Sequence, residues 1–174
     1  MKALPQLGFL EAVKLASSRI FDFKGRSRRS EFWWWIPIVL IANWVLSSLT
    51  DNLLINGIIA TVVMFFGLSA TARRLQDADK SAWWVYISYA LGILNTVVAA
   101  TSPAMNKLME SVSMGSLDED AILKVWGGNA GEMIFYTGTS FLFGLSVLIV
   151  FIMCLKDSDP ETTEHGDSPK YVDE

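Results

Sequence analysis

The chain has 174 residues, of which 52% are hydrophobic and 18% are charged, with a formal net charge of −4. Soluble domains carry about 25% charged residues, and the charges here are clustered so that four uncharged stretches remain, each at least about 19 residues long and close to the length of a membrane-spanning helix. A soluble bundle would need polar stripes at helical spacing and a β-barrel would need strict alternation, and these stretches have neither.

The first 22 residues have the spacing of an amphipathic helix, with apolar residues at roughly helical intervals and Pro5 near the start, where proline is tolerated. We expect residues 1–31 to form a cytoplasmic amphipathic helix followed by a basic segment. Two placements fit this helix: the membrane surface, apolar face down, or the cytoplasmic side of the protein itself. The apolar residues include Leu4, Leu7, Leu10, Val13, Ile20 and Phe21.

Two boundary segments share one order, in which basic residues precede tryptophans. They are FDFKGRSRRSEFWWW at residues 21–35 and ARRLQDADKSAWW at residues 72–84. Basic residues favour the anionic inner leaflet, and tryptophans favour the membrane interface. We therefore predict interface anchors at Trp33, Trp34, Trp35, Trp83 and Trp84.

The chain from 32 to 155 is predicted to be a four-helix transmembrane domain. Either Pro37 kinks the first span or the regular helix begins near Trp35. We expect an acidic, flexible cytoplasmic tail at 156–174. The predicted spans are 32–49, 53–72, 83–100 and 133–155, and the connection at 101–132 is predicted to be an extracytoplasmic helical insertion.

The insertion carries signals for two short amphipathic helices. Ser102-Pro103 reads as an N-cap followed by a first-turn proline, and Gly115 ends the first helix. Ser116 and Glu119 fit a capping box for the second helix, which Gly127-Gly128 ends. Both helices are expected on the outer membrane surface or against the end of the bundle.

Orientation follows from the basic residues. Twelve of the 14 Lys and Arg residues fall in the N-terminal segment, the loop between spans two and three, and the tail, and only Lys107 and Lys124 fall on the other side. The positive-inside rule therefore places the N- and C-termini in the cytoplasm. We find no signal peptide, because the first apolar stretch is long enough to remain as a span.

With both boundary segments in view, the chain resembles the bacterial inner-membrane proteins classed as domain of unknown function 805. Two positions depart from the family pattern: Gln76 replaces its usual His, and Ala82 its usual Gly. A closing motif survives only weakly around residues 166–171. The resemblance covers all four spans, treats the outer connection as an insertion, and implies a multi-pass bacterial inner-membrane protein of undefined activity. The residues that match are Phe23, Gly25, Arg26, Arg29, Glu31, Phe32 and Trp33 in the first segment, and Arg73, Arg74, Leu75, Asp77, Ser81, Trp83 and Trp84 in the second.

Charged residues of the two boundary segments are expected near one membrane face. Arg73 and Arg74 are four and three residues before Asp77, so one helical turn would bring them together. Two interpretations stay open: structural ion pairs that bracket the spans, or a site for an anionic lipid or another phosphorylated ligand, which bidentate arginine suits. The residues are Arg26, Arg29, Glu31, Arg73, Arg74 and Asp77.

Enzyme signatures such as G-x-S-x-G, a Walker loop or H-E-x-x-H are missing. The single Cys154 excludes an intramolecular disulfide, and the lone His165 cannot supply a zinc site. We expect no catalytic residue, cofactor, metal or nucleic-acid partner. The leading hypothesis is a non-enzymatic membrane protein that binds lipid, including anionic lipid, or a protein partner.

The alternative hypothesis is a small oligomeric transporter or channel. The spans hold no charged residue or histidine, which argues against proton coupling. Their polar residues are more typical of interhelical hydrogen bonds. Ser140 and Gly144 have the spacing of a close helix contact. The polar residues are Asn43, Ser47, Ser48, Thr61, Asn95, Thr96, Thr137 and Ser140.

Overall fold

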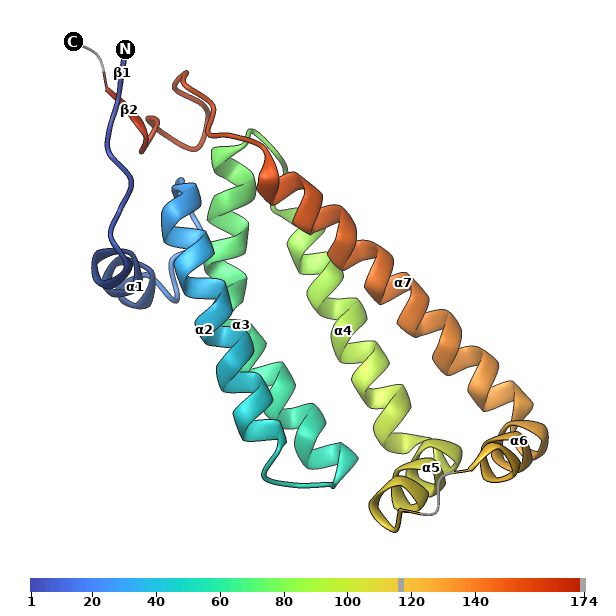
Figure 1. Cartoon of the computed structure of the whole chain (residues 1–174). Coiled ribbons are helices and arrows are strands. Elements are labelled where there is room, and N and C mark those ends of the chain that lie inside the picture. The colour runs from blue at the N-terminus through green and yellow to red at the C-terminus, as the bar shows by residue number, and fades with distance from the viewer. Residues whose placement is uncertain (116–117, 173–174) are drawn as a thin grey trace.

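The described part of the chain, residues 1–115 and 118–172, folds into seven helices and one short strand pair in the computed structural model. Four long helices run side by side, and both termini lie at one end of this bundle, here called the terminal end (Figure 1). The predicted all-helical class is confirmed for these residues. The elements are β1 (Lys2–Ala3), α1 (Phe9–Ser18), α2 (Arg29–Ser47), α3 (Leu53–Asp77), α4 (Trp83–Thr101), α5 (Pro103–Ser113), α6 (Glu119–Gly128), α7 (Ala130–Leu155) and β2 (Tyr171–Val172).

Three of the described helices, α3, α4 and α7, have the length and apolar composition of membrane-spanning helices. They coincide with the second, third and fourth predicted spans. Helix α2 overlaps the first, but it is less apolar because its sequence includes charged residues, an asparagine and four tryptophans. These residues are Arg29, Glu31, Trp33, Trp34, Trp35, Asn43 and Trp44.

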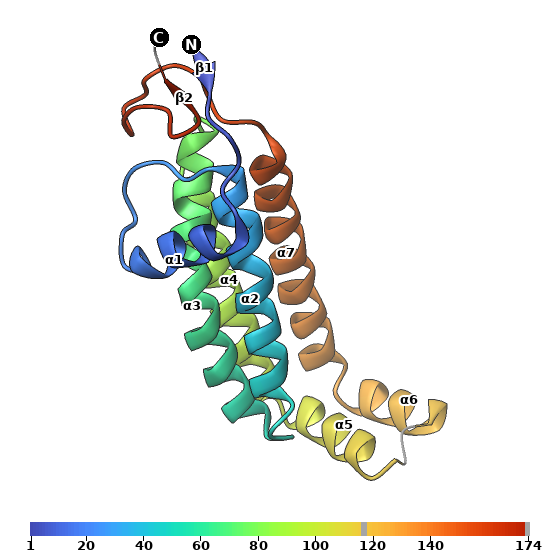
Figure 2. The same ribbon diagram turned by 60° about the vertical axis from the view of Figure 1, so that its left-hand side comes forward.

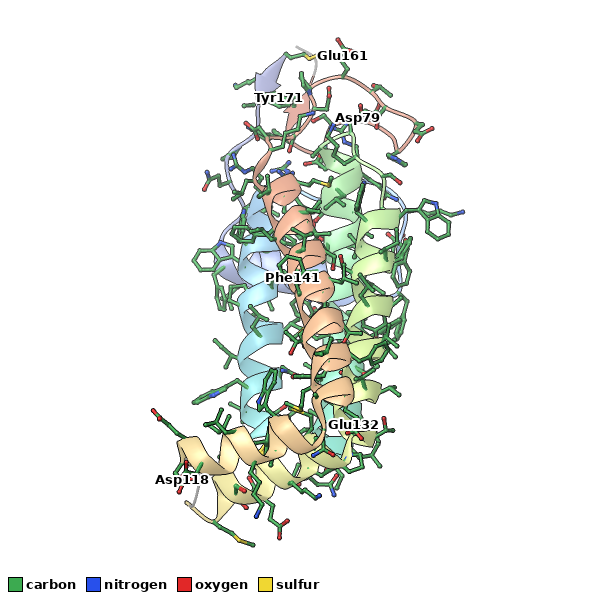
Figure 3. The ribbon with its side chains drawn as sticks, turned by 90° about the vertical axis from the view of Figure 1, so that its right-hand side faces the viewer. Asp79, Asp118, Glu132, Phe141, Glu161 and Tyr171 are labelled. Carbon is green, nitrogen blue, oxygen red and sulfur yellow. The ribbon has the colours of Figure 1, made fainter. Side chains whose placement is uncertain are left out.

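The surface of the long helices is apolar, whereas their shared interior is small. Phe141 of α7 is 69% exposed and points away from the bundle (Figure 3), and Ile41 of α2 is 60% exposed. Water penalises such exposure, whereas hydrocarbon does not. The best-buried apolar residues gather toward the terminal end, where Leu75, Val85 and Cys154 join α3, α4 and α7.

The N-terminal helix is shorter than predicted. Instead of residues 1–22, α1 covers only Phe9–Ser18. The preceding segment is extended: β1 pairs antiparallel with β2, and the Leu4 backbone N–H donates to the Lys170 carbonyl at 2.8 Å. Pairing with the tail satisfies the backbone groups that a helix would otherwise satisfy. The apolar periodicity of the sequence cannot show whether this segment forms a helix or pairs with the tail.

Helix α1 crosses the bundle and packs on α2 (Figure 2). Its inner face carries Ala12 and Ala16, four residues apart and at most 1% exposed, and these small side chains let the two helices approach closely. Leu10 on another face is 79% exposed. Of the two predicted placements, packing on the protein is the one observed for the alanine face.

Helix α2 begins at Arg29, so of the two alternatives for this region a start near Trp35 is not the one observed. The first turn is already closed, because the Phe32 backbone N–H donates to the Arg28 carbonyl at 3.1 Å. Pro37 lies inside the helix, where its missing N–H cannot donate to the preceding turn.

The insertion contains the two short helices that its capping signals predict, α5 and α6. The Ser102 hydroxyl accepts the Met105 N–H at 3.2 Å and donates to the Glu132 carboxylate at 2.8 Å, so the first turn of α7 is tied to the start of α5. Both helices project beside the far end of the bundle, with Asp118 and Glu132 marking the arm in Figure 3. The predicted capping residue Ser116 lies outside the described residues.

The tail, whose composition predicts an acidic and flexible segment, follows a defined path. Residues 156–172 fold back over the ends of α3 and α7, and β2 within them pairs with β1 (Figure 1). The Asp159 N–H donates to the Asp77 carbonyl at 2.9 Å. Composition predicted disorder because the tail is polar and acidic, but its contacts use backbone groups, which composition does not display.

Helix α3 ends in a Schellman motif with an aspartate in the left-handed position. The Lys80 N–H donates to the Leu75 carbonyl at 2.8 Å, and the Asp79 N–H donates to the Gln76 carbonyl at 3.2 Å. Asp79 has φ of 54°. Glycine usually takes this position because a Cβ is strained there, although Asp tolerates it better than most residues.

We therefore expect Asp79→Gly to stabilise the protein and Asp79→Ala to destabilise it, each by about 0.5–1 kcal/mol. Asp79 is exposed, so neither change disturbs packing. Thermal unfolding in detergent, followed by circular dichroism, measures both variants. An Asp79→Ala variant that is as stable as the Asp79→Gly variant, or more stable, would contradict the backbone explanation.

Candidate functional site

Five charged residues of the two boundary segments meet at the terminal end of the bundle and are buried there. We call Arg26, Glu31, Arg73, Arg74 and Asp77 the arginine cluster. Arg73, Arg74 and Asp77 are 0% exposed, Glu31 is 1% and Arg26 is 5%. The structure thus brings together five of the six residues that the sequence analysis singled out. Burying a charge is costly without a partner, so a buried guanidinium requires hydrogen-bond acceptors around it.

Asp77 accepts from two arginines. The Arg26 Nε lies 3.0 Å from one carboxylate oxygen, and the Arg74 Nη1 lies 2.5 Å from the other. The Ser158 hydroxyl, from the tail, donates at 2.5 Å to the same Asp77 oxygen that accepts from Arg74. Each Asp77 oxygen is thus occupied by protein donors.

Arg73 points in a different direction from Arg74, since adjacent residues on a helix point about 100° apart. Its Nη2 donates to Glu31 of α2 at 3.0 Å, and its Nη1 donates to the Arg19 carbonyl at 2.7 Å and to the Asp22 carbonyl. The predicted i,i+4 pair of Arg73 with Asp77 does not form.

Each of the three arginines reaches the C-terminal end of a helix. Arg73 donates to Arg19, which ends α1. Arg74 donates to the Cys154 carbonyl at 3.2 Å and to the Lys156 carbonyl, which end α7. Arg26 donates to the Asp77 carbonyl at 3.3 Å, at the end of α3. The last carbonyls of a helix lack intrahelical donors and carry partial negative charge, so a guanidinium satisfies both needs.

Arg26 also ties in the tail. Its guanidinium donates to the carbonyls of Glu161 at 2.7 Å, of Gly166 at 3.3 Å and of Asp159. Glu161 lies beside the strand pair at the terminal end (Figure 3). Because most of the guanidinium donors of the cluster bind protein acceptors within a buried volume, this arrangement can hold α1, α2, α3, α7 and the tail together.

Three buried polar atoms in or beside the cluster have no hydrogen-bond partner among the described residues: the Arg73 Nε, the Gln76 Oε1 and the Ser27 Oγ. Gln76 stands at a position where the family that the chain resembles usually has histidine. Its amide N–H donates to the Phe23 carbonyl at 3.3 Å.

Arg29, the sixth predicted residue, stands apart from the cluster. Its side chain is 43% exposed, and its Nη1 lies 3.8 Å from Asp157. It lines a surface groove of about 490 Å³ at the terminal end. We call this the basic groove; it includes Arg28, Arg29, Trp33, Trp34, Asp157 and Lys170.

The basic groove carries three cations against one carboxylate. The Arg28 Nη1 donates to the Pro5 carbonyl at 3.1 Å, and the Lys170 ammonium donates to Asp157 at 2.6 Å. This hydrogen bond lowers the pKa of the Asp157 carboxyl below its ordinary value and raises the pKa of Lys170 above its own. The sequence did not indicate Lys170, because it lies 141 positions after Arg29 and reaches the groove only through the β1–β2 pairing.

The predicted interface tryptophans fall into two groups. Trp34, Trp83 and Trp84 are 46%, 70% and 42% exposed, as an anchor at the headgroups requires. Trp35 is 8% exposed, and its Nε1 donates to the Phe66 carbonyl of α3 at 2.9 Å, which makes it a packing residue. Trp33 is half-buried and contacts Phe151 of α7 edge to face. Anchoring itself stays a prediction.

Polar side chains within the long helices mostly bond between or along helices. The Asn95 Oδ1 of α4 accepts from Thr139 at 3.1 Å and from Ser140 at 2.8 Å, both on α7. Gly144 has no neighbour within 4 Å of an added Cβ, so the predicted close contact at this glycine is wrong. The tight approaches are instead at Gly92, against Phe143, and at Gly57, against Thr96.

Among the described residues, Cys154 and His165 lie apart from the arginine cluster. Cys154 is 0% exposed and lies in the apolar core. His165 lies 3.4 Å from Glu164, whose side chain is 84% exposed. Within residues 1–115 and 118–172, no group of three His, Cys, Asp or Glu side chains gathers as metal ligands.

Comparison with known proteins places most of the chain in one family model. The model described as "Protein of unknown function (DUF805)" matches residues 20–167. Two curated relatives, each named inner membrane protein YhaH, come from Escherichia coli strain K12 and from E. coli O157:H7; both are 36% identical over 75 residues, covering 37% of this chain and 61% of the relative. The chain thus spans less than two thirds of these relatives. No solved structure matches.

The arginine cluster leads to a prediction about the tail. Arg26→Gln removes donors to three tail carbonyls, and breaking a buried ion pair costs about 3–5 kcal/mol. We expect the tail of this variant to be cleaved faster after Glu161 and Glu164 by a Glu-specific protease. Lys80→Gln, an exposed charge in the loop after α3, is the matched control. Equal cleavage rates for Arg26→Gln and the unmodified chain would show that the tail is held without this guanidinium.

Proposed function

The chain belongs to the DUF805 protein family, and we propose that it is a non-enzymatic inner-membrane protein whose cytoplasmic end binds anionic lipid headgroups. The name of the E. coli relatives supports the inner membrane as its location. The outward-facing apolar side chains of the long helices support a bilayer as the surrounding solvent.

In this proposal α2 is the fourth spanning helix, beside the three helices of clear spanning composition. Its 19 residues are about 28 Å long at 1.5 Å per residue, close to the hydrocarbon thickness of about 30 Å. Exposed Ile41 and Trp44 continue the apolar surface of its neighbours. An even number of spans leaves both termini on one side, and their basic residues assign that side to the cytoplasm.

The basic groove is the observation that carries lipid binding. Arg29 and Lys170 remain partly exposed, Arg28 lies beside them, and Asp157 offsets only one of the three positive charges. Trp34 of the same groove is 46% exposed at the start of α2. A cationic site at the depth of interfacial tryptophans suits the phosphate of an anionic lipid. The buried arginine cluster supports this site by fixing α2 and the tail.

The alternative of an oligomeric transporter or channel would need the polar residues of α2 and α4 to face a pore. The Asn95 amide is bonded to α7 instead. We therefore favour lipid binding, by which the protein would act as an accessory to other components of the membrane.

The four-span topology predicts opposite labelling at two sites. With Cys154→Ser as background, we expect Ser113→Cys in α5 to react with a membrane-impermeant maleimide in intact spheroplasts. Glu164→Cys in the tail should react only after permeabilisation. Both positions are exposed. Labelling of Glu164→Cys in intact spheroplasts would contradict a cytoplasmic tail.

Headgroup binding is tested by removing the two arginines of the groove. We expect Arg28→Gln with Arg29→Gln to lower retention of phosphatidylglycerol in native mass spectrometry by at least about tenfold, since a single charge-assisted bond contributes about 1.5–3 kcal/mol and about 1.4 kcal/mol corresponds to a factor of ten. Lys24→Gln, exposed in the same basic segment, is the control and should retain the lipid.

Two further arms identify the ligand. Phosphatidylcholine should be retained weakly by all variants, because its headgroup has no net charge. Inorganic phosphate should compete only weakly if the membrane-anchored lipid is the ligand, and strong competition would point to a soluble phosphate instead. Equal retention of phosphatidylglycerol by the double variant and the Lys24 control would contradict the proposed site.

A further inference from the structure

A second cavity lies among the four long helices. It has a volume of about 400 Å³, within the range of about 300–1,000 Å³ that is typical of sites for small molecules. Its walls are mainly apolar and include Leu40 of α2, Met64 of α3, Ile93 of α4 and Val147 of α7. Such walls suit an apolar occupant.

The cavity has the depth of one lipid leaflet. Its α3 wall runs from Ala60 to Thr71, which is about 16 Å along the helix at 1.5 Å per residue. Half of the hydrocarbon core is about 15 Å thick. Thr71 lies near the terminal end, two residues before Arg73, so the cavity extends from that end to about the middle of the bilayer.

One side of the cavity is open. The main packing runs from α2 to α3, from α3 to α4 and from α4 to α7, so that α2 and α7 face each other across the remaining side. Leu40 of α2 and Val147 of α7 both line the cavity, yet they are 51% and 44% exposed. These two residues therefore form the rim of a lateral opening toward lipid.

The cavity is aligned with the basic groove along α2. Trp33 lines the groove, whereas Ile36, Leu40 and Asn43 line the cavity. Their spacing of i, i+3, i+7 and i+10 places them on one helix face. Trp33 contacts Phe151 of α7 at 5.7 Å between ring centroids. The cationic groove therefore lies on the terminal-end side of this aromatic pair, and the apolar cavity lies on the side toward the middle of the bundle.

We propose that the cavity holds one acyl chain of the anionic glycerophospholipid whose headgroup occupies the basic groove. The inference rests on the proposed headgroup site and adds the chain-binding part of the ligand. A charged site at the headgroup level, followed by an apolar cavity one leaflet deep, matches a lipid of the cytoplasmic leaflet. A helix of a second copy fits less well, because it would not place negative charge against Arg28, Arg29 and Lys170.

The test uses phosphatidylglycerol with a diazirine in the middle of one acyl chain, added to the full chain in nanodiscs. Crosslinked peptides are mapped by mass spectrometry, and retention of ordinary phosphatidylglycerol is measured in parallel. We expect crosslinks on the cavity residues Leu40, Met64 and Val147. Outward-facing Ile41 and Phe141 should be labelled only as bulk lipid labels them.

Two variants fill the cavity from different helices. Ala60→Phe fills it from α3 and Ser88→Leu from α4, and both residues line it. We expect each variant to lower the cavity crosslinks by about tenfold, the factor that corresponds to losing about two buried methylene groups. Val62→Phe, on the 53% exposed face of α3, is the matched control and should leave the crosslinks unchanged.

The outcomes separate the two proposals. Retention that depends on Arg28 and Arg29, with crosslinks only on outward-facing residues, would overturn the acyl-chain inference and leave the headgroup site intact. Equal retention of phosphatidylglycerol by the unmodified chain and by the Arg28→Gln, Arg29→Gln variant would overturn the headgroup site. Crosslinks between two protein chains at Leu40 and Val147 would overturn the inference, because they would show that a second copy of the chain occupies the opening. Cavity crosslinks that persist in both filling variants would also overturn the inference.

Discussion

Guanidinium groups bound to the C-terminal carbonyls of helices are the interaction on which the terminal end of this fold depends. Arg73, Arg74 and Arg26 each reach the end of a different helix, α1, α7 and α3. Helix ends expose carbonyls that water normally satisfies, and a buried end needs another donor. Two carboxylates offset most of the charge, while the carbonyls use the remaining donors. An apolar substitute would lack those donors, which explains why charged residues occupy this interior position.

The rest of the bundle follows a different rule. Its long helices carry apolar side chains on their outer surface, as Phe141 does on α7, and their own backbone bonds are satisfied within each helix. Cohesion between them then depends on close approaches such as Gly92 against Phe143 and on the Asn95 bonds to α7. Burial is therefore concentrated where the membrane is expected to end, and the cavity lies among the long helices.

Sequence alone could predict the elements but only part of the site. Uncharged stretches located all four long helices, and Ser102-Pro103 located the start of α5, because length and capping are local properties. The proximity of the two arginine motifs was also predictable from topology. Their pairing was not, since Arg73 bonds Glu31 and Arg74 bonds Asp77, a choice set by side-chain direction. Backbone acceptors in the tail, and Lys170 in the basic groove, leave no local pattern in the sequence.

The tail carbonyls bound by Arg26 have a consequence for biogenesis. They belong to residues 159, 161 and 166, which leave the ribosome only after all the long helices have been made. Until then the guanidinium of Arg26 lacks several acceptors, so the bundle stays incompletely assembled at its terminal end. A polypeptide truncated just after α7 would keep all four long helices and still expose this defect, which gives cellular proteolysis a physical basis for recognising a chain that lacks the tail.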